Sequence, residues 1–351
     1  MKRGYRNRDY IETVEGLLFT VVGDVHPVDR VLAYLKYVPN RKGAWGFETR
    51  RYDRALKYYS TLHVKGTFDY LEEFYPQYLY NSETQHLLIS AVPLYSIRVH
   101  YCPESRLSDL LGAEHLDPLE RKAVRLLETV SKQSRVDPKQ FGITGSILVD
   151  IHNPAFSDID LTVYGKENSL KVKTAVLDML HSGNPSLRSF DEAAVKKWVT
   201  SRAWLYPLDR SEVERIYRRH WNRGIFEGTD FSIHPGRVET EIGETYGDRI
   251  YSPEGIVDAE AIIDDARESV FMPGTYRIGS VRILNGPSVA DIKEIATYEG
   301  FYCDIASLGE RVQARGKLER VYDKRNGDVY HRIVIGSIEA KGTDYLKPKA
   351  R

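Results

Sequence analysis

The feature that most constrains how this chain folds is the segment from Phe141 to Gly165. A short apolar run ends at Gly145-Ser146, eleven residues follow, and Asp158-Ile159-Asp160 opens a second apolar run. Residues two apart in a β-strand project from the same face, so both carboxylates point to one place while Ile159 faces a core. The segment therefore predicts a strand, a tight turn and a second strand that carries two neighbouring acids, followed by a helix.

The paired carboxylates predict a divalent cation. Two carboxylates held side by side repel each other unless a cation lies between them. Oxygen ligands favour Mg²⁺ or Mn²⁺, and Mg²⁺ commonly combines one or two carboxylates with phosphate oxygens of a substrate. Gly145-Ser146 suits those phosphates, because glycine permits close backbone approach and the free N–H groups of a starting helix attract anions. Either motif alone is usually structural, but the combination favours function.

These residues carry a family resemblance. Gly145-Ser146 with Asp158-Ile159-Asp160 resembles the signature of the polymerase-β-like nucleotidyltransferase superfamily. The resemblance implies a small mixed sheet with helices on one side, and transfer of a nucleoside monophosphate from an NTP to an acceptor with release of pyrophosphate. It implies that Gly145 and Ser146 contact the β- and γ-phosphates and that Asp158 and Asp160 bind the metal ions.

The superfamily usually has a third carboxylate on a neighbouring strand, which acts as base for the attacking hydroxyl. Asp230 is our candidate for this catalytic and metal-binding role, because it opens an apolar strand after the intervening helices. A turn residue after Gly228 is the alternative interpretation. Glu239 and Glu241 are reserve candidates.

The chain as a whole also resembles an uncharacterised archaeal group of predicted nucleotidyltransferases. This resemblance rests on residues 23–31 and 228–235, and it implies no particular substrate.

A basic helix and its exit carry further candidates. Arg215, Arg218, Arg219, His220 and Arg223 crowd this segment, and among them we select Arg219 and Arg223 as nucleotide-binding residues. They could hold a triphosphate or an RNA backbone, or they could form a solvated helix face paired with nearby glutamates, and both interpretations stay open.

Two histidines are weaker candidates. His26 precedes a proline in a tight connection, where a structural turn is favoured. His152 could approach the phosphates, but a loop histidine is more often incidental.

We expect an α+β protein of three domains. Residues 1–115 form a strand-rich α/β unit, 116–268 the polymerase-β-like nucleotidyltransferase domain, and 269–351 a small β-barrel. Asp117-Pro118-Leu119-Glu120 predicts a capped helix start, and Ser211 with Glu214 predicts another. Asn326-Gly327 predicts a hairpin. Aromatic and basic residues in the barrel are compatible with oligonucleotide binding or simply with a core.

The composition limits which classes of partner the protein can bind. Lys+Arg and Asp+Glu are balanced at 50 each, so any surface for a polyanion must be local. Only two cysteines occur, and no apolar run is long enough to cross a bilayer, so we expect a soluble cytoplasmic protein without a membrane partner.

The acceptor is the least determined part of the prediction. We favour RNA, including tRNA, because the flanking domains outweigh the catalytic one. The alternatives are a small molecule, a protein side chain, or a non-catalytic nucleic-acid-binding protein that keeps the fold. Base preference and oligomeric state stay open.

Overall fold

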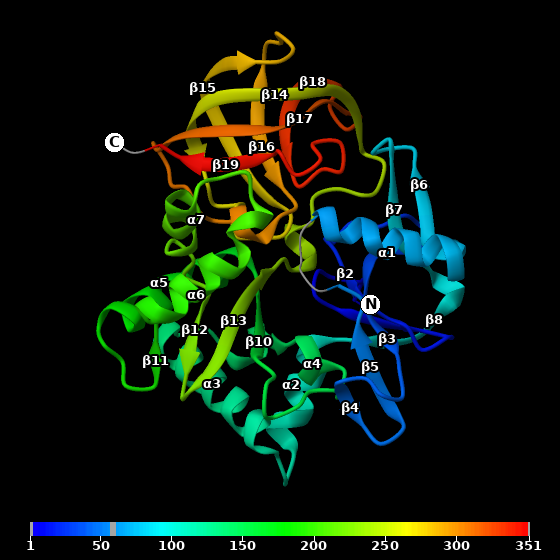
Figure 1. Ribbon diagram of the computed structural model, residues 1–351, viewed down its shortest axis with the longest axis vertical. Helices are drawn as coiled ribbons and strands as arrows, with labels where there is room; N and C mark the ends of the chain where they lie inside the picture. The colour runs from blue at the N-terminus through cyan, green and yellow to red at the C-terminus, as the bar shows by residue number, and fades with distance from the viewer. Residues whose placement is uncertain (1–2, 57–60, 350–351) are drawn as a thin grey trace.

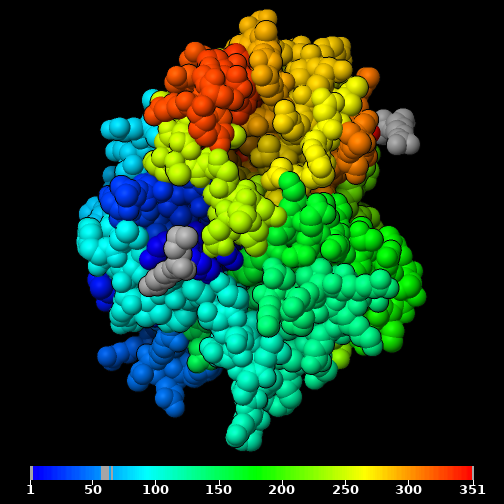
Figure 2. Space-filling view, turned by 180° about the vertical axis from the view of Figure 1, so that it is seen from behind, coloured from blue at the N-terminus to red at the C-terminus, as the bar shows by residue number. Residues whose placement is uncertain are grey.

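A computed structural model describes residues 3–56 and 61–349 of the chain. It shows a mixed α+β protein built on three separate sheets, which follow one another along the sequence. Figure 1 shows the N-terminal sheet in blue, the central sheet with its helices in green, and the C-terminal sheet in yellow to red. Figure 2 shows the same division from behind. No helix among the described residues is both long and apolar enough to span a bilayer.

The N-terminal sheet is mainly an antiparallel meander. Its strands are β1 (Tyr10–Thr13), β2 (Leu18–Val21), β3 (Arg30–Pro39), β4 (Trp45–Phe47), β5 (Arg50–Arg54), β6 (Leu79–Ser82), β7 (Leu87–Pro93) and β8 (Ile97–Tyr101). The order is β4-β5-β3-β2-β1-β8. Strand β7 pairs with β6 and with the N-terminal end of β3. Helix α1 (Thr61–Phe74) contributes Leu71 to a core that includes Phe19 and Val31.

The central sheet has the order β11-β12-β13-β10-β9. Its strands are β9 (Phe141–Ile143), β10 (Ile159–Tyr164), β11 (Leu187–Arg188), β12 (Arg223–Phe226) and β13 (Thr229–Gly236). Strand β10 runs parallel to β13 and antiparallel to β9. The helices of this part are α2 (Pro103–Gly112), α3 (Pro118–Ser134), α4 (Gly145–Leu148), α5 (Lys166–His181), α6 (Glu192–Arg202) and α7 (Arg210–Tyr217). Short 3₁₀ turns occur at 76–78, 94–96, 138–140, 203–205, 239–241 and 300–302.

Capping explains where two of these helices begin. The Asp117 side chain accepts from the amides of Leu119 and Glu120, and the Glu120 carboxylate accepts from the Asp117 amide, which confirms the predicted start of α3. Helix α7, in contrast, begins at Arg210 rather than after Ser211. Asp209 and Glu212 form its capping box, and this pair has the same spacing as the predicted one but lies two residues earlier.

The C-terminal sheet closes on itself. Its strands are β14 (Arg249–Asp265), β15 (Gly274–Asn285), β16 (Ile292–Thr297), β17 (Arg311–Asp323), β18 (Asp328–Ile335) and β19 (Tyr345–Pro348). They pair in the order β14-β15-β16-β18-β17, and β14 also pairs with β17, so the ring is complete and β19 adds to β17. The predicted hairpin at Asn326-Gly327 connects β17 to β18. Strand β14 belongs to this ring although it precedes residue 269.

Two apolar clusters join the central part to its neighbours. Val199 of α6 and Ile216 of α7 share a core with barrel residues such as Ile295. On the other side, Leu148 and Val149, at the end of α4, pack with Tyr37 and other residues of the N-terminal sheet. A cavity of 1990 Å³ lies where the three parts meet, and all three contribute residues to its wall.

Candidate active site

The Gly-Ser turn lies directly against the acid pair. The Thr144 amide donates to the Asp160 carbonyl at 2.9 Å, which joins the end of β9 to the start of β10. Gly145 follows with φ of +69°, and a Cβ at this position would lie 2.3 Å from Oδ2 of Asp160. Both the left-handed backbone and the contact require glycine. The carboxylate of Asp160 is therefore in van der Waals contact with the backbone of the turn.

The turn is also fixed to the N-terminal sheet region. The Thr144 hydroxyl donates to the carbonyl of Arg8 at 2.7 Å. Arg8 has φ of +75°, an uncommon conformation for a residue other than glycine. The Ile151 amide donates to the Ser146 carbonyl at 3.0 Å and closes the loop after α4. Gly145, Ser146 and Arg8 all line the cavity.

The pKa values of the two acids of the pair are shifted in opposite directions. The charge of Asp160, followed by burial, raises the pKa of Asp158 to about 6. Burial alone would raise the pKa of Asp160, but bonds from His234 and Ser232 hold it well below its usual range. Lys36 of β3 lowers the pKa of both acids, and Arg54 of β5 lowers that of Asp158. The N-terminal sheet therefore places positive charge opposite the pair.

Strand β13 presents a polar row to the same place. Because β10 and β13 are parallel and Asp160 is level with Ser232, side chains at 230, 232 and 234 share the face of the acid pair. The Ser232 hydroxyl donates to Oδ1 of Asp160. Nε2 of His234 lies 2.7 Å from Oγ of Ser232 and 3.4 Å from Oδ1 of Asp160. Burial, assisted by the charge of Arg8, lowers the pKa of His234 to about 4, so this imidazole is neutral at pH 7.

Asp230 lines the cavity two residues before Ser232, on the same face of the sheet. Asp230 directly precedes Phe231, which pairs with Ile159, and partial burial raises the pKa of Asp230. Its carboxylate does not form a close cluster with Asp158 and Asp160. Within the part of the chain that the structure describes, only one trio of potential ligands has all its ligand atoms within 4.8 Å of one another, and that trio lies elsewhere.

That trio consists of Asp9, His100 and Cys102. Nε2 of His100 lies 2.7 Å from Asp9, whose two oxygens also accept from Arg3 at 2.7 and 2.8 Å. Burial would lower the pKa of His100, but the bond to Asp9 raises it to about 9. The buried carboxylate is therefore already compensated by protein cations, which makes this trio an ion-pair network.

The two predicted nucleotide-binding arginines lie in different surroundings. Arg223 pairs across β12 and β13 with Ser232 and lines the cavity. Its Nε is buried and has no hydrogen-bond partner among residues 3–56 and 61–349. Arg219 instead bonds Glu310 at 2.9 Å and the Ile305 carbonyl at 2.7 Å, so it attaches α7 to the barrel. The structure brings Arg223, but not Arg219, to the acid pair.

Other candidates from the sequence have structural partners. Arg218 pairs with Glu192 and Glu214 at the surface. Nε2 of His152 lies 2.7 Å from the helix-capping Asp117, and His152 does not line the cavity. His26 lies between the Tyr5 carbonyl and the Leu32 amide.

The reserve acids are also engaged. Glu239 pairs with Arg6, and Glu241 accepts from the amides of Lys166 and Val238. Glu241 lines the cavity and Glu239 does not.

Sequence reasoning missed several residues of this site. His234 and Ser232 alternate with buried Phe231 and Ile233, and this period of two was a signal that could have placed them beside Asp230. Lys36 carries no comparable signal, because only the packing of the N-terminal sheet brings it to the acid pair.

The geometry defines a mixed α+β protein with two neighbouring carboxylates against a glycine turn in a cavity shared by three parts. No protein-family profile matches the chain, and no solved structure matches it. The chain is 32% identical over 349 residues to an uncharacterised protein of Methanocaldococcus jannaschii, MJ1086. The alignment covers 98% of this chain and 99% of that protein. The chain therefore belongs to the same family as this archaeal protein.

Proposed function

We propose that this protein is a metal-dependent nucleotidyltransferase with a polymerase-β-like central domain. The observation that carries the proposal is the contact between Gly145 and the Asp160 carboxylate, with Asp158 beside it on the same cavity wall. A phosphate bound at the turn and a cation bound by the acids would then be immediate neighbours. Nucleotidyl transfer requires this arrangement, because a cation must bridge phosphates that the protein holds.

The donor set fits Mg²⁺ or Mn²⁺. Asp158 and Asp160 supply carboxylate oxygens, and the raised pKa of Asp158 arises mainly from the negative charge of its neighbour. A divalent cation bound here would neutralise the developing charge on the transferred phosphoryl group. Asp230 lies on the rim of the same face and is the candidate third ligand if its side chain turns toward the pair.

The chain's own residues would bind and position the reactants. Gly145 and Ser146 face the triphosphate with main-chain amides, and Arg223 offers a buried N–H that is free to bond an anionic oxygen. The acceptor hydroxyl attacks the α-phosphorus as the bond to pyrophosphate breaks, and its proton passes to Asp230 as base. Ser232 and His234 hold Asp160 in its charged form and fixed orientation.

The size of the cavity supports a large acceptor. At 1990 Å³ it exceeds the roughly 300–1000 Å³ of typical small-molecule sites. We therefore favour RNA, including tRNA, as the acceptor. A small molecule or a protein side chain is the second candidate, and a non-catalytic nucleic-acid-binding protein the third.

The test is incubation of the protein with each labelled NTP, Mg²⁺ and total archaeal RNA. Label should transfer with the wild type and not with the Asp158→Asn/Asp160→Asn variant. Asp178→Asn is the matched control, because Asp178 is exposed on α5 and lies outside the cavity. If the wild type binds no NTP–Mg²⁺ in a direct titration, the catalytic proposal fails. If it binds NTP but never labels RNA, the small-molecule or protein acceptor becomes the leading candidate.

A further inference from the structure

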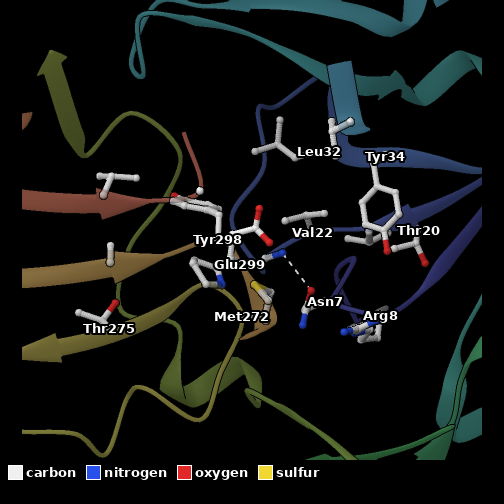
Figure 3. A pocket seen from close by; sticks show the side chains of 18 of the residues that line it. Asn7, Arg8, Thr20, Val22, Leu32, Tyr34, Met272, Thr275, Tyr298 and Glu299 are labelled. Carbon is white, nitrogen blue, oxygen red and sulfur yellow. Dashed lines mark hydrogen bonds between the residues drawn. The ribbon is translucent and has the colours of Figure 1, made fainter. Parts of the chain in front are cut away.

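A recess of the cavity lies between the N-terminal sheet and the barrel. Figure 3 shows its two walls: Thr20, Val22 and Leu32 come from the N-terminal part, and Met272 and Tyr298 come from the barrel. Val22, Leu32 and Met272 are apolar, so much of the recess offers no hydrogen bonds. Polar side chains also surround it, among them Arg8, Tyr34 and Glu299 (Figure 3). Two further polar groups, on Thr20 and Asn7, have a hydrogen-bonding atom without a protein partner among the described residues.

The hydroxyl of Thr20 is the first of these groups. Thr20 is only 2% exposed, it lines the recess, and its Oγ1 has no hydrogen-bond partner in the described chain. A buried hydroxyl without a partner destabilises the folded protein, and most such groups in native proteins are paired. An unpaired hydroxyl in the wall of a cavity therefore indicates a ligand that bonds to it.

The side chain of Asn7 is the second polar group, and hydrogen bonds fix both its backbone and its side chain. Its backbone amide donates to Asp24 at 3.0 Å, and its Oδ1 accepts from the Gly23 amide at 3.3 Å. Figure 3 shows this second bond and places Asn7 between the two walls. None of the described residues accepts from its Nδ2, so this nitrogen remains as a positioned donor.

The recess is connected to the acid pair through two elements. Arg8, next to Asn7, accepts the bond from Thr144 that fixes the Gly-Ser turn. On β3, Tyr34 pairs with Thr20, and Lys36 lies two residues further on, where its charge acts on the acid pair. Two residues of strand span about 7 Å. The recess is therefore adjacent along β3 to the positive charge that acts on the acid pair.

We propose that this recess binds the base of the nucleoside triphosphate. A base is a flat ring with apolar faces and a polar edge, which matches apolar side chains around one hydroxyl and one amide nitrogen. Thr20 and Asn7 bond the edge of the base, while Val22, Leu32 and Met272 contact its faces. This assignment rests on the proposed nucleotidyltransferase function, and it gives the N-terminal domain the role of selecting the nucleotide.

The test is direct titration of wild type and Thr20→Val with each of the four NTPs and Mg²⁺, and with inorganic tripolyphosphate and Mg²⁺. Valine keeps the shape of threonine and removes its hydroxyl. Thr20→Val should bind the preferred NTP about tenfold more weakly and should bind tripolyphosphate as the wild type does. Thr13→Val is the matched control, because Thr13 of β1 is a buried threonine of the same sheet that does not line the cavity.

The outcomes separate the two proposals. If the wild type binds NTPs and Thr20→Val keeps the same affinities and ranking, the base site is wrong while the proposed function stands. If Thr20→Val loses tripolyphosphate as well, the hydroxyl acts on the phosphate site and the base site is again wrong. If the wild type binds no NTP, both fail. Leu32→Trp, which fills the recess from its apolar wall, gives a second reading: it should block NTP and spare tripolyphosphate.

Discussion

Replacing Gly145 with alanine perturbs the one contact on which the proposed function depends. The new Cβ would lie 2.3 Å from Oδ2 of Asp160, far inside van der Waals contact. Asp160 cannot move away freely, because Ser232 and His234 hold its other oxygen. Either the turn or the carboxylate must shift. The left-handed backbone adds about 1–2 kcal/mol of strain for any residue with a Cβ.

Gly183 supplies a matched control for this substitution. It has nearly the same backbone conformation, with φ of +70°, and a Cβ there would meet nothing within 4 Å. Gly145→Ala and Gly183→Ala should therefore lose about 1–2 kcal/mol of unfolding free energy alike from the backbone. Only Gly145→Ala should lose metal affinity, by at least the roughly 10–100-fold that follows when a metal ligand loses its orientation.

The assay is titration of each variant with Mn²⁺, with and without an NTP, in which the electron paramagnetic resonance signal measures the free ion. Urea unfolding of each variant measures its stability. Equal loss of stability with unequal loss of Mn²⁺ affinity supports the argument. If Gly145→Ala binds Mn²⁺ and NTP as tightly as Gly183→Ala does, the acid pair does not depend on the turn. The arrangement proposed for the active site would then be refuted.

Two further predictions follow from charges near the site. Arg223→Met should weaken NTP binding about tenfold or more, because the proposed phosphate ligand loses a buried guanidinium donor. Arg219→Met should leave NTP binding unchanged and lower only the stability of the fold, because Arg219 bonds Glu310 of the barrel. Titration with NTP and urea unfolding of both variants test this difference. The pKa of His100 is about 9 in the folded protein, above its ordinary value of 6.5. Protonation of His100 therefore stabilises the fold fully below pH 6.5, and this stabilisation is lost as the pH rises through about 9. Unfolding measured from pH 6 to 10 should show this loss in the wild type and in exposed His115→Gln, but not in His100→Gln.

Local signals in the sequence were sufficient for part of this structure. Three predicted features depend on neighbouring residues, and the structure contains them: the turn at Gly145, the capped start of α3, and the strand after the turn. This strand, β10, carries Asp160 but begins at Ile159, so Asp158 directly precedes it. Where one local pattern competed with another, the prediction was wrong by two residues. Asp209 and Glu212 form the capping box of α7. They are three residues apart, as are Ser211 and Glu214, so both pairs fit the capping-box pattern and the spacing alone did not distinguish them.

The remaining site residues could not be found by local reasoning. Lys36 and Arg8 belong to the N-terminal part, more than a hundred residues from Asp160, and only tertiary packing brings them into the cavity. Arg219 illustrates the converse. Its position beside Arg223 suggested a shared role, but helix α7 and strand β12 direct the two side chains to the barrel and to the cavity.

Basic residues of the N-terminal part reduce the electrostatic repulsion between the two acids of the central part. Asp158 and Asp160 repel each other in a largely buried place, and the pKa of Asp158 rises for that reason. Lys36 and Arg54 offset this repulsion while no cation is bound. In the proposed function, a bound divalent ion would add to that compensation and would lower the pKa of Asp158. The packing of the N-terminal sheet against the central part therefore supplies positive charge to the proposed catalytic pair through Lys36 and Arg54.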